Sequence, residues 1–333
     1  SDQETSLHSF IHQHLPGKYS DAVIGKWHLG PQPGGLEHPA DLGIGHFAGI
    51  IGGGVDDYQD WRLVVNGERS SETTYTTTKL VDLAVDWTAS QDKPWFLWLA
   101  FNAPHTPFHL PPNDLHDRQL SGTEADIEAN PSPYYFAAIE AMDSEIGRLL
   151  NSLDEQTREN TIIIFMGDNG TPGQVAQSPF SRTKSKGSVY QGGVNIPFFV
   201  TGPGVTRIGE RESELVNTTD LFSTIAALAG VNVDEVNDSI SFEKLLSQAP
   251  SAEPDRYIQY TDQSTDTGER WAISDGMYKL IESSSGELEL YYLVDDPFEE
   301  YDLVALGSAP ADVITDLQFL ANQIRTGTTT KNY

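Results

Sequence analysis

The chain of 333 residues contains no cysteine. Disulfide bonds and thiolate metal ligands are therefore excluded within it, and its redox compartment stays open. It also lacks any apolar run of about eighteen residues, so no segment is predicted to span a membrane. No signal peptide is recognisable, and residue 1 is Ser rather than Met, which leaves the natural N-terminus open.

Basic residues are scarce. The 20 Lys and Arg residues stand against 49 Asp and Glu residues, giving a formal net charge of -29. A nucleic-acid partner needs a basic surface and is not expected. The acidity is interpreted as a solubility feature, and it repels anions at long range. An anionic substrate must therefore be captured by a local cluster of cationic side chains or by a metal.

Buried strands and amphipathic helices alternate along most of the chain. Strands are expected at residues 21–24, 95–101, 161–166 and 196–200, because each run is short, apolar and bounded by turn residues. Apolar residues at steps of three and four predict helices at 74–90, 134–153 and 219–229. This alternation predicts an α/β fold with a mostly parallel sheet flanked by helices.

The pattern of predicted secondary structure changes after about residue 255. Three short strand patterns, at 271–273, 278–281 and 288–292, are separated by Asp-Gly and Ser-Gly turns. A helix at 310–325 follows, so we expect a small antiparallel sheet with one helix. The Pro- and Ser-rich stretch 249–254 suggests an α/β domain over residues 1–250 and a C-terminal α+β subdomain over 251–333.

Residues 31–58 are rich in Gly and Pro and are predicted to form a long loop. Gly52-Gly53-Gly54 within this stretch lacks the strand-and-helix context of a phosphate-binding loop. We interpret the three glycines as turn residues.

Four polar segments stand where strands end or begin, which is where α/β proteins bind ligands. They are Gly25–Gly30, Asn102–Pro107, Gly167–Gly170 and Lys184–Gly193. Together they offer the candidate cations and donors Lys26, His28, His105 and Lys186. They also offer Asp168 and Asn169, whose hard oxygens suit Ca²⁺ or Mg²⁺. A metal and several cations together are what hydrolysis of a charged ester needs.

Each segment alone has a simpler interpretation. Asp168-Asn169-Gly170 is typical of a turn. His105, which stands between prolines, is typical of an ordinary loop residue. Lys184 and Lys186 are typical of a solvated pair on the surface. The functional hypothesis depends on all four segments occupying equivalent topological positions.

The same segments, in this order, resemble the sulfatase family of the alkaline-phosphatase superfamily. The resemblance covers nearly the whole chain. Its matching segments are Ile24–Gly30, Asp92–Pro107, Gly167–Gly170, Lys186–Pro197, and Leu290–Leu293 with Asp296-Pro297-Phe298-Glu299. In place of the Glu and Arg that the family commonly has, this chain has Gln191 and Asn195.

The resemblance implies a role for each candidate residue. Lys26 and His28 would contact the nucleophile and the sulfate, and these two with His105 and Lys186 form the implied catalytic set. Lys26, His105 and Lys186 would bind substrate, with His105 and Lys186 supporting the leaving group. Asp168 and Asn169 would ligate a divalent cation, usually Ca²⁺, with Mg²⁺ as the alternative.

The family's nucleophile is a formylglycine made from Cys or Ser in a Cys/Ser-x-Pro-x-Arg motif. That motif and an Asp-Asp pair of metal ligands precede the Gly-Lys-Trp-His segment in the family, and neither occurs at that place here. Ser251–Arg256 has one residue too many for the motif, and Asp56-Asp57 follows a glycine loop rather than a buried strand. The resemblance thus implies an N-terminally incomplete sulfatase fold with no nucleophile in this chain and with formylglycine expected only upstream.

Three hypotheses follow. The first is a metal-dependent sulfuric ester hydrolase of which this chain is the C-terminal portion. The second is a noncatalytic protein that binds sulfate or glycans. The third is a phosphate or phosphonate monoesterase of the same superfamily. The implied partner is a sulfated small molecule or sulfated glycan, and the implied location is periplasmic or extracellular. The oligomeric state is left open.

We expect residues 1–333 alone to bind divalent cations weakly and to hydrolyse no ester, because the nucleophile motif and two of the family's metal carboxylates are absent from them. Titration calorimetry with CaCl₂ measures the first property, and release of nitrophenol from nitrophenyl sulfate measures the second. Tight Ca²⁺ binding would contradict the expectation.

Overall fold

A computed structural model describes residues 5–29, 35–233, 235–249, 258–265 and 268–326. The chain divides into two units, Ser1–Asn160 and Thr161–Tyr333. The boundary predicted between residues 250 and 251 lies outside the described residues and stays a prediction. No helix in the described ranges is long and apolar enough to cross a membrane.

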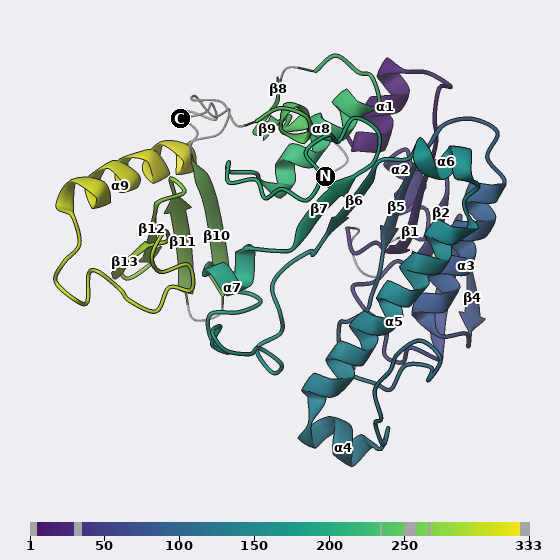
Figure 1. Cartoon of the computed structure of the whole chain (residues 1–333), viewed down its shortest axis with the longest axis horizontal. Coiled ribbons are helices and arrows are strands. Elements are labelled where there is room, and N and C mark those ends of the chain that lie inside the picture. The colour runs from purple at the N-terminus through teal and green to yellow at the C-terminus, as the bar shows by residue number, and fades with distance from the viewer. Residues whose placement is uncertain (1–4, 30–34, 234, 250–257, 266–267, 327–333) are drawn as a thin grey trace. The chain divides into compact units, whose positions relative to one another are not determined.

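The first unit is built on a five-stranded sheet with the order β4-β3-β2-β1-β5 (Figure 1). Strand β1 pairs in parallel with β2 on one side and with β5 on the other. Strands β3 and β4 extend the sheet in antiparallel fashion. The strands are β1 (Ser20–Lys26), β2 (Phe47–Ile50), β3 (Trp61–Val65), β4 (Glu68–Glu72) and β5 (Trp95–Ala100).

Helix α3 (Thr76–Ala89) packs against this sheet and against the long helix α5 (Pro131–Ser152) (Figure 1). Leu80, Val81 and Ala84 are fully buried on its inner face, in one cluster with Ile24 of β1. The pattern that predicted this helix included Leu80 and Ala84 together with Leu83 and Trp87, which join the same cluster. The unit also contains α1 (Leu7–His14), α2 (His38–Asp41), α4 (Glu124–Ala129) and α6 (Glu155–Glu159).

The prediction of an unbroken loop over residues 31–58 is wrong. Its described part contains α2 and the buried parallel strand β2, whose Phe47 and Ala48 are 2% and 0% exposed. Strand β2 has four residues and one of them is Gly49. So short a strand with a central glycine carries little β-strand signal.

The prediction that residues 95–101 form a strand buried on both faces is only half right. Strand β5 forms, but it ends the described sheet, and the side chain of Trp98 is 49% exposed. An edge strand lacks the neighbour that covers an interior one. The predicted buried strands in the second unit behave similarly. Strands β6 (Ile163–Met166) and β7 (Phe198–Thr201) form an antiparallel pair in which Phe199 is 64% exposed.

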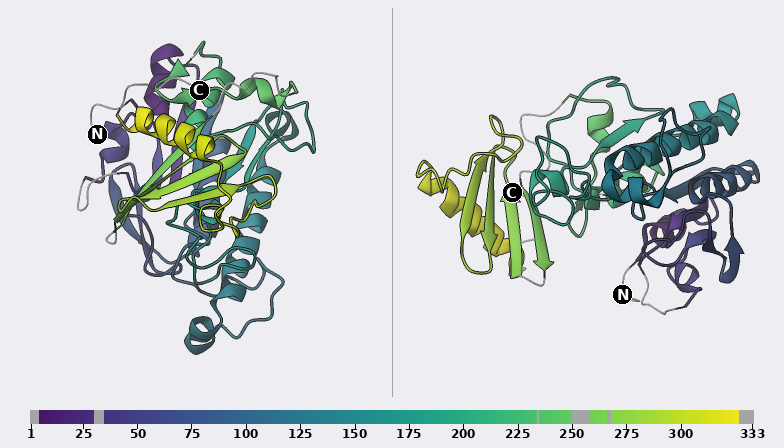
Figure 2. Two further views of the ribbon diagram at one scale, coloured as in Figure 1. Left: turned by 90° about the vertical axis from the view of Figure 1, so that its left-hand side faces the viewer. Right: turned by 90° about the horizontal axis from the view of Figure 1, so that it is seen from below.

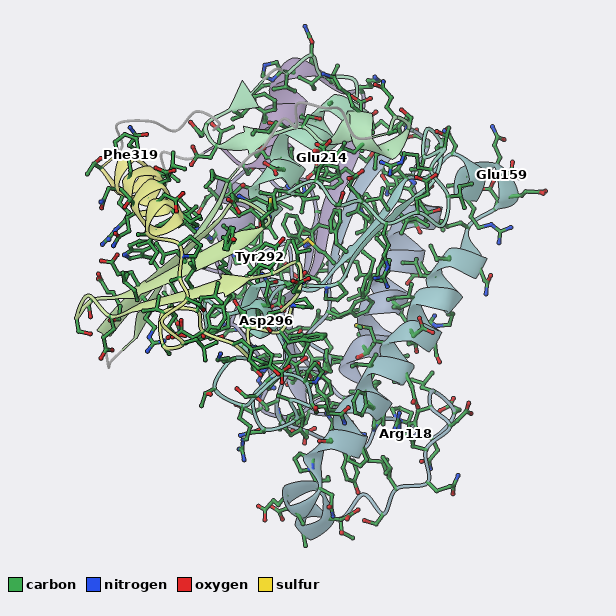
Figure 3. The ribbon with its side chains drawn as sticks, turned by 60° about the vertical axis from the view of Figure 1, so that its left-hand side comes forward. Arg118, Glu159, Glu214, Tyr292, Asp296 and Phe319 are labelled. Atoms are coloured by element: carbon green, nitrogen blue, oxygen red, sulfur yellow. The ribbon has the colours of Figure 1, made fainter. Side chains whose placement is uncertain are left out.

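The second unit ends in the predicted small antiparallel sheet and helix, and the sheet has a fourth strand, β10, that the sequence did not predict. The sheet order is β10-β11-β12-β13, and α9 (Ala311–Arg325) lies across one face (Figure 2). Leu317 and Ala321 of α9 are buried with Ile273 and Leu280 of the sheet, whereas Phe319 is on the exposed side (Figure 3). The strands are β10 (Gln259–Thr265), β11 (Gly268–Ser274), β12 (Tyr278–Ser283) and β13 (Leu288–Tyr292).

The remaining elements of the second unit are short. They are α7 (Gln191–Val194), a 3₁₀ turn (Thr218–Asp220) leading into α8 (Leu221–Leu228), the two-residue strands β8 (Glu235–Val236) and β9 (Ser239–Ile240), and a 3₁₀ turn (Glu243–Leu246). The architecture is therefore α/β, with the three parallel strands β2, β1 and β5 on one side of the sheet of the first unit and a small antiparallel C-terminal sheet.

Close approach of the backbones sets the spacing between β1 and β5. Gly25 in β1 has a φ of +116°, and a Cβ added to it would lie 1.9 Å from the carbonyl oxygen of Ala100. No side chain fits there without separating the two strands, and the backbone conformation itself favours glycine. Gly17, with a φ of +71°, has the same preference but no atom within 4 Å of such a Cβ.

We expect Gly25→Ala to destabilise the protein more than Gly17→Ala does. Gly17→Ala adds only left-handed strain of roughly 1–2 kcal/mol, whereas Gly25→Ala also drives a methyl group into the Ala100 carbonyl. Chemical denaturation of the two variants measures the difference. Equal losses in the free energy of unfolding would show that the close approach is unimportant.

Candidate functional site

Three of the predicted site residues lie in the first unit, at or after the carboxyl ends of two neighbouring parallel strands. Lys26 is the last residue of β1, and His28 follows two residues later. Strand β5 runs parallel to β1 with Ala100 opposite Gly25, so the segment with His105 begins at that same edge. The register thus places Lys26, His28 and His105 on loops at the carboxyl ends of neighbouring strands, as expected. Gly30 of this segment lies outside the described residues.

The backbone at His28 is unusual. Its φ is +52°, a conformation that is uncommon for residues other than glycine. The His28 N–H donates to the carbonyl of Ile51 at 3.1 Å, and its imidazole lies against Gly53. A Cβ on Gly53 would be 2.6 Å from His28 Cε1. Gly53 therefore makes room for a site residue, a role that its sequence context did not distinguish from a turn.

Two tyrosines hold the segment that carries His105. The Tyr58 hydroxyl donates to the His105 carbonyl at 2.8 Å, and the Tyr58 ring stacks on His109 at 3.9 Å between centroids. The Tyr75 hydroxyl lies 3.0 Å from His109 Nε2. Burial raises the pKa of Tyr75 to about 12 and lowers that of His109. These groups therefore stay neutral near neutral pH and act as fixed hydrogen-bonding partners.

The tautomer of His105 follows from its neighbours. His105 Nδ1 lies 2.9 Å from the carbonyl oxygen of Thr106, which can only accept, so Nδ1 carries the proton of this contact. Nε2 is then the ring nitrogen that remains for a ligand. Protonated at Nε2, the imidazole is a cation that donates a hydrogen bond.

Asn102 is a further candidate for the site, which the sequence argument did not select. Its side chain directly follows β5, the residue is 3% exposed, and neither its amide nitrogen nor its oxygen has a hydrogen-bond partner in the described part of the chain. A buried amide without partners is costly, so native proteins rarely keep one. The buried amide thus marks a position where another polar group would bind. No sequence signal separates it from a structural asparagine.

Asp168 and Asn169 directly follow β6, and Lys186 lies on a neighbouring loop of the same unit. Gly170 N donates to the Gly193 carbonyl at 3.0 Å, and Lys186 N donates to the Thr171 carbonyl at 3.0 Å. These bonds tie the two segments together. Asp168 is exposed and Lys186 is partly exposed, so both side chains reach solvent.

The donor set for a divalent cation is incomplete in the described residues. The Asp168 carboxylate and the Asn169 amide oxygen are hard ligands of the type that Ca²⁺ prefers, but this ion takes about six to eight oxygens. No group of three or more Asp, Glu or His side chains in the described ranges is arranged to hold a metal. Asp57 Oδ1 accepts from Gln59 N at 2.7 Å within a turn, so this carboxylate acts locally.

We expect Gly53→Ala to displace the His28 imidazole, because the added methyl group overlaps the ring. The neighbouring Gly54→Ala is the matched control, since a Cβ there meets nothing within 4 Å. Carbon–proton NMR spectra of the histidine rings measure the effect. The His28 signals should move in Gly53→Ala alone, and unchanged signals there would contradict the packing.

Comparison with known proteins places the chain among sulfatases along most of its length. The family profile described as Sulfatase matches residues 2–231, and the profile described as N-sulphoglucosamine sulphohydrolase, C-terminal, matches residues 183–326. An uncharacterized sulfatase of Escherichia coli, YdeN, is 27% identical over 77% of this chain and 49% of its own. The arylsulfatase of Klebsiella aerogenes is 25% identical over 64% of this chain and 66% of its own.

The N-acetylgalactosamine-6-sulfatase of the dog, Canis lupus familiaris, is 28% identical over 69% of this chain and 46% of its own. The chain thus spans about half the length of two of these relatives.

Solved structures share the fold. The crystal structure of Ps i-CgsB with k-i-k-neocarrahexaose aligns with a TM-score of 0.77 and 24% identity, covering 100% of this chain and 76% of that one. A second structure, in complex with its substrate D-glucosamine-2-N,6-O-disulfate, aligns with a TM-score of 0.75 and 19% identity, covering 98% and 82%.

Proposed function

The chain belongs to the sulfatase family, and we propose that the protein of which it forms part hydrolyses sulfate monoesters. The observation that carries the proposal is the placement of the candidate residues. Lys26 ends β1 and the other candidate residues follow β1, β5 or β6, on segments held by the hydrogen bonds described above. On a chain of net charge -29, capture of an anionic ester demands cations held at the binding site, and these residues are the proposed ones.

In the first unit, Lys26 and His105 would bind sulfate oxygens, and His28 with Lys26 would contact the nucleophile. Hydrolysis of a sulfate monoester breaks the bond between sulfur and the bridging oxygen, and negative charge develops on that oxygen. His105, protonated at Nε2, would donate a hydrogen bond or a proton to it. The contact between Nδ1 and the Thr106 carbonyl keeps the ring oriented for this role.

In the second unit, Lys186 would neutralise charge on the sulfate and the leaving oxygen. A fixed ammonium stabilises the transition state because it needs no reorganisation as the charge develops. The nucleophile is expected to lie outside residues 1–333, in agreement with the absence of the family's nucleophile motif from this sequence.

The sulfatase family generally depends on a divalent cation, and we propose Ca²⁺ for this protein, with Asp168 and Asn169 as two of its ligands. When bound, such an ion would polarise the ester oxygens and favour an ionised nucleophile. The remaining ligands would come from outside the described residues, because two oxygens fill only part of a Ca²⁺ shell.

A sulfated saccharide is the proposed substrate class. The named substrate of one solved structure is a disulfated glucosamine, and the canine relative is named for a sulfated N-acetylgalactosamine. By resemblance to the sulfatase family, we propose a periplasmic or extracellular location. Unsulfated esters would lack the charge that Lys26, His105 and Lys186 are proposed to bind.

The test uses the product of the full open reading frame that contains residues 1–333. We expect it to hydrolyse nitrophenyl sulfate in preference to nitrophenyl phosphate, and Lys186→Ala or His105→Ala to lower kcat/KM at least about a hundredfold, as loss of one transition-state donor does. Lys244→Ala, at an exposed lysine of the second unit, is the matched control and should retain activity. A preference for the phosphate ester would assign the phosphatase alternative. Binding of sulfated saccharides without turnover would assign the noncatalytic one.

A further inference from the structure

The segment Asp296-Pro297-Phe298-Glu299 has no part in the function proposed above. Glu299 is nevertheless one of the most buried residues of the second unit, with 1% of its surface exposed. It also has a φ of +58°, in the left-handed region that side chains other than glycine rarely adopt. A buried glutamate in a strained conformation persists only where surrounding contacts hold it there.

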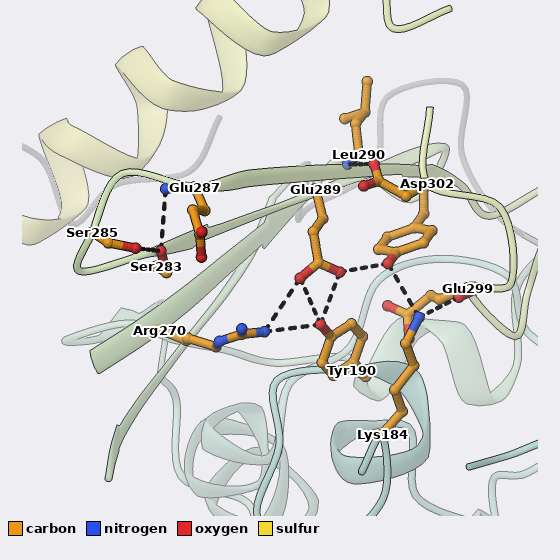
Figure 4. Close-up of polar contacts among 11 residues, drawn as sticks. Lys184, Tyr190, Arg270, Ser283, Ser285, Glu287, Glu289, Leu290, Glu299 and Asp302 are labelled. Atoms are coloured by element: carbon orange, nitrogen blue, oxygen red, sulfur yellow. Dashed lines mark hydrogen bonds and ion pairs between the residues drawn. The ribbon is translucent and has the colours of Figure 1, made fainter. Parts of the chain in front are cut away.

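Glu299 holds both ends of the loop that carries Lys186. Its carboxylate oxygen Oε2 accepts from the N–H of Gln191 at 2.6 Å. Its backbone carbonyl accepts from Nζ of Lys184 at 2.5 Å (Figure 4). Lys186 lies between these two attachment points. One residue, more than a hundred positions further along the chain, therefore bridges the loop at its start and at its end.

The Lys184 side chain is enclosed by structural partners. Its Nζ also donates to the Tyr291 hydroxyl at 3.1 Å and lies 4.6 Å and 4.7 Å from the ring centroids of Tyr190 and Tyr291. Both tyrosine hydroxyls donate to Glu289, which also pairs with Arg270 at 3.2 Å (Figure 4). Lys184 is thus a cation of the scaffold, whereas Lys186 is the one proposed to meet the substrate.

The other carboxylate oxygen of Glu299 forms an ion pair with Lys279. Nζ and Oε1 are 2.8 Å apart, and their side chains are 4% and 1% exposed. Burial lowers the pKa of Lys279, and the facing Glu299 opposes that shift while Lys184 adds to it. A buried ion pair contributes little net stability compared with apolar side chains of similar size. The ion pair between Glu299 and Lys279 is better explained by the position in which it holds the Glu299 carboxylate.

We propose that Glu299 is a positioning residue, which with Lys279 as its counter-ion fixes loop 184–191 so that Lys186 faces the substrate. The proposal rests on the function proposed for Lys186, and it assigns a purpose to the Asp-Pro-Phe-Glu segment. Glu299 itself touches no substrate and acts through the Gln191 N–H and the Lys184 ammonium.

The first test compares Glu299→Gln with Glu300→Gln in the full-length protein. The two substitutions are chemically identical and adjacent, but Glu300 is exposed. Hydrogen exchange measured by mass spectrometry should accelerate in peptides covering residues 184–194 in Glu299→Gln alone. With nitrophenyl sulfate, kcat should fall by about a hundredfold, as misplacement of a catalytic group by about 1 Å does, and Glu300→Gln should match the unaltered protein.

The second test separates positioning from stability. The double variant Glu299→Leu with Lys279→Met replaces the ion pair with an apolar pair, which should restore the unfolding midpoint to near that of the unaltered protein. Activity and protection of residues 184–194 should remain lost. Recovery of both together with stability would overturn the proposal, as would unchanged exchange in Glu299→Gln.

Hydrogen exchange does not depend on turnover. If the unaltered protein hydrolyses no sulfate ester, the proposed function fails, while faster exchange of the loop in Glu299→Gln still supports the positioning contact. If the unaltered protein is active and Glu299→Gln is equally active, the positioning role alone fails.

Discussion

The parallel pairing of β1 with β5 determines where the chemistry of the first unit lies. Gly25 lets the two backbones approach so closely that a Cβ would overlap the Ala100 carbonyl, and the register of the pair brings the ends of β1 and β5 side by side. Because both strands run in the same direction, the loops that follow them share one edge. At these strand ends, His28 has a left-handed backbone conformation, and the segment with His105 is held by a hydrogen bond from Tyr58.

In the second unit the corresponding organising group is a carboxylate. Glu299, held over Lys279, receives one hydrogen bond from each end of a loop, while Gly170 and Lys186 join that loop to the segment with Asp168. Mobile surface lysines on so acidic a chain would be drawn to the nearest carboxylates. A loop fixed by buried contacts keeps its cation in one place, and fixed charges are the ones that stabilise a transition state.

The sequence predicted the long helices and the C-terminal sheet well, because helix α3 and strands β11 to β13 carry strong periodic patterns. It failed at β2, where four residues with a central glycine resemble a loop. It also missed the exposure of Trp98, since an apolar run does not reveal whether a strand has neighbours on both sides. Motifs located the candidate residues, whereas the contacts of Gly53 and Glu299 and the burial of Asn102 arise only on folding, and no local pattern reports them.

The position of β5 at the end of the sheet of the first unit has a consequence for handling the protein. Trp95–Ala100 is an entirely apolar strand that ends the described sheet, and such margins tend to pair with one another and seed aggregates. The mutual repulsion of chains with a net charge of -29 opposes that encounter. Protection of this kind is electrostatic, so it weakens as salt shortens the range of the repulsion and as acid neutralises the carboxylates. The colloidal behaviour of the chain is thus coupled to one six-residue strand and to the ionic composition of its surroundings.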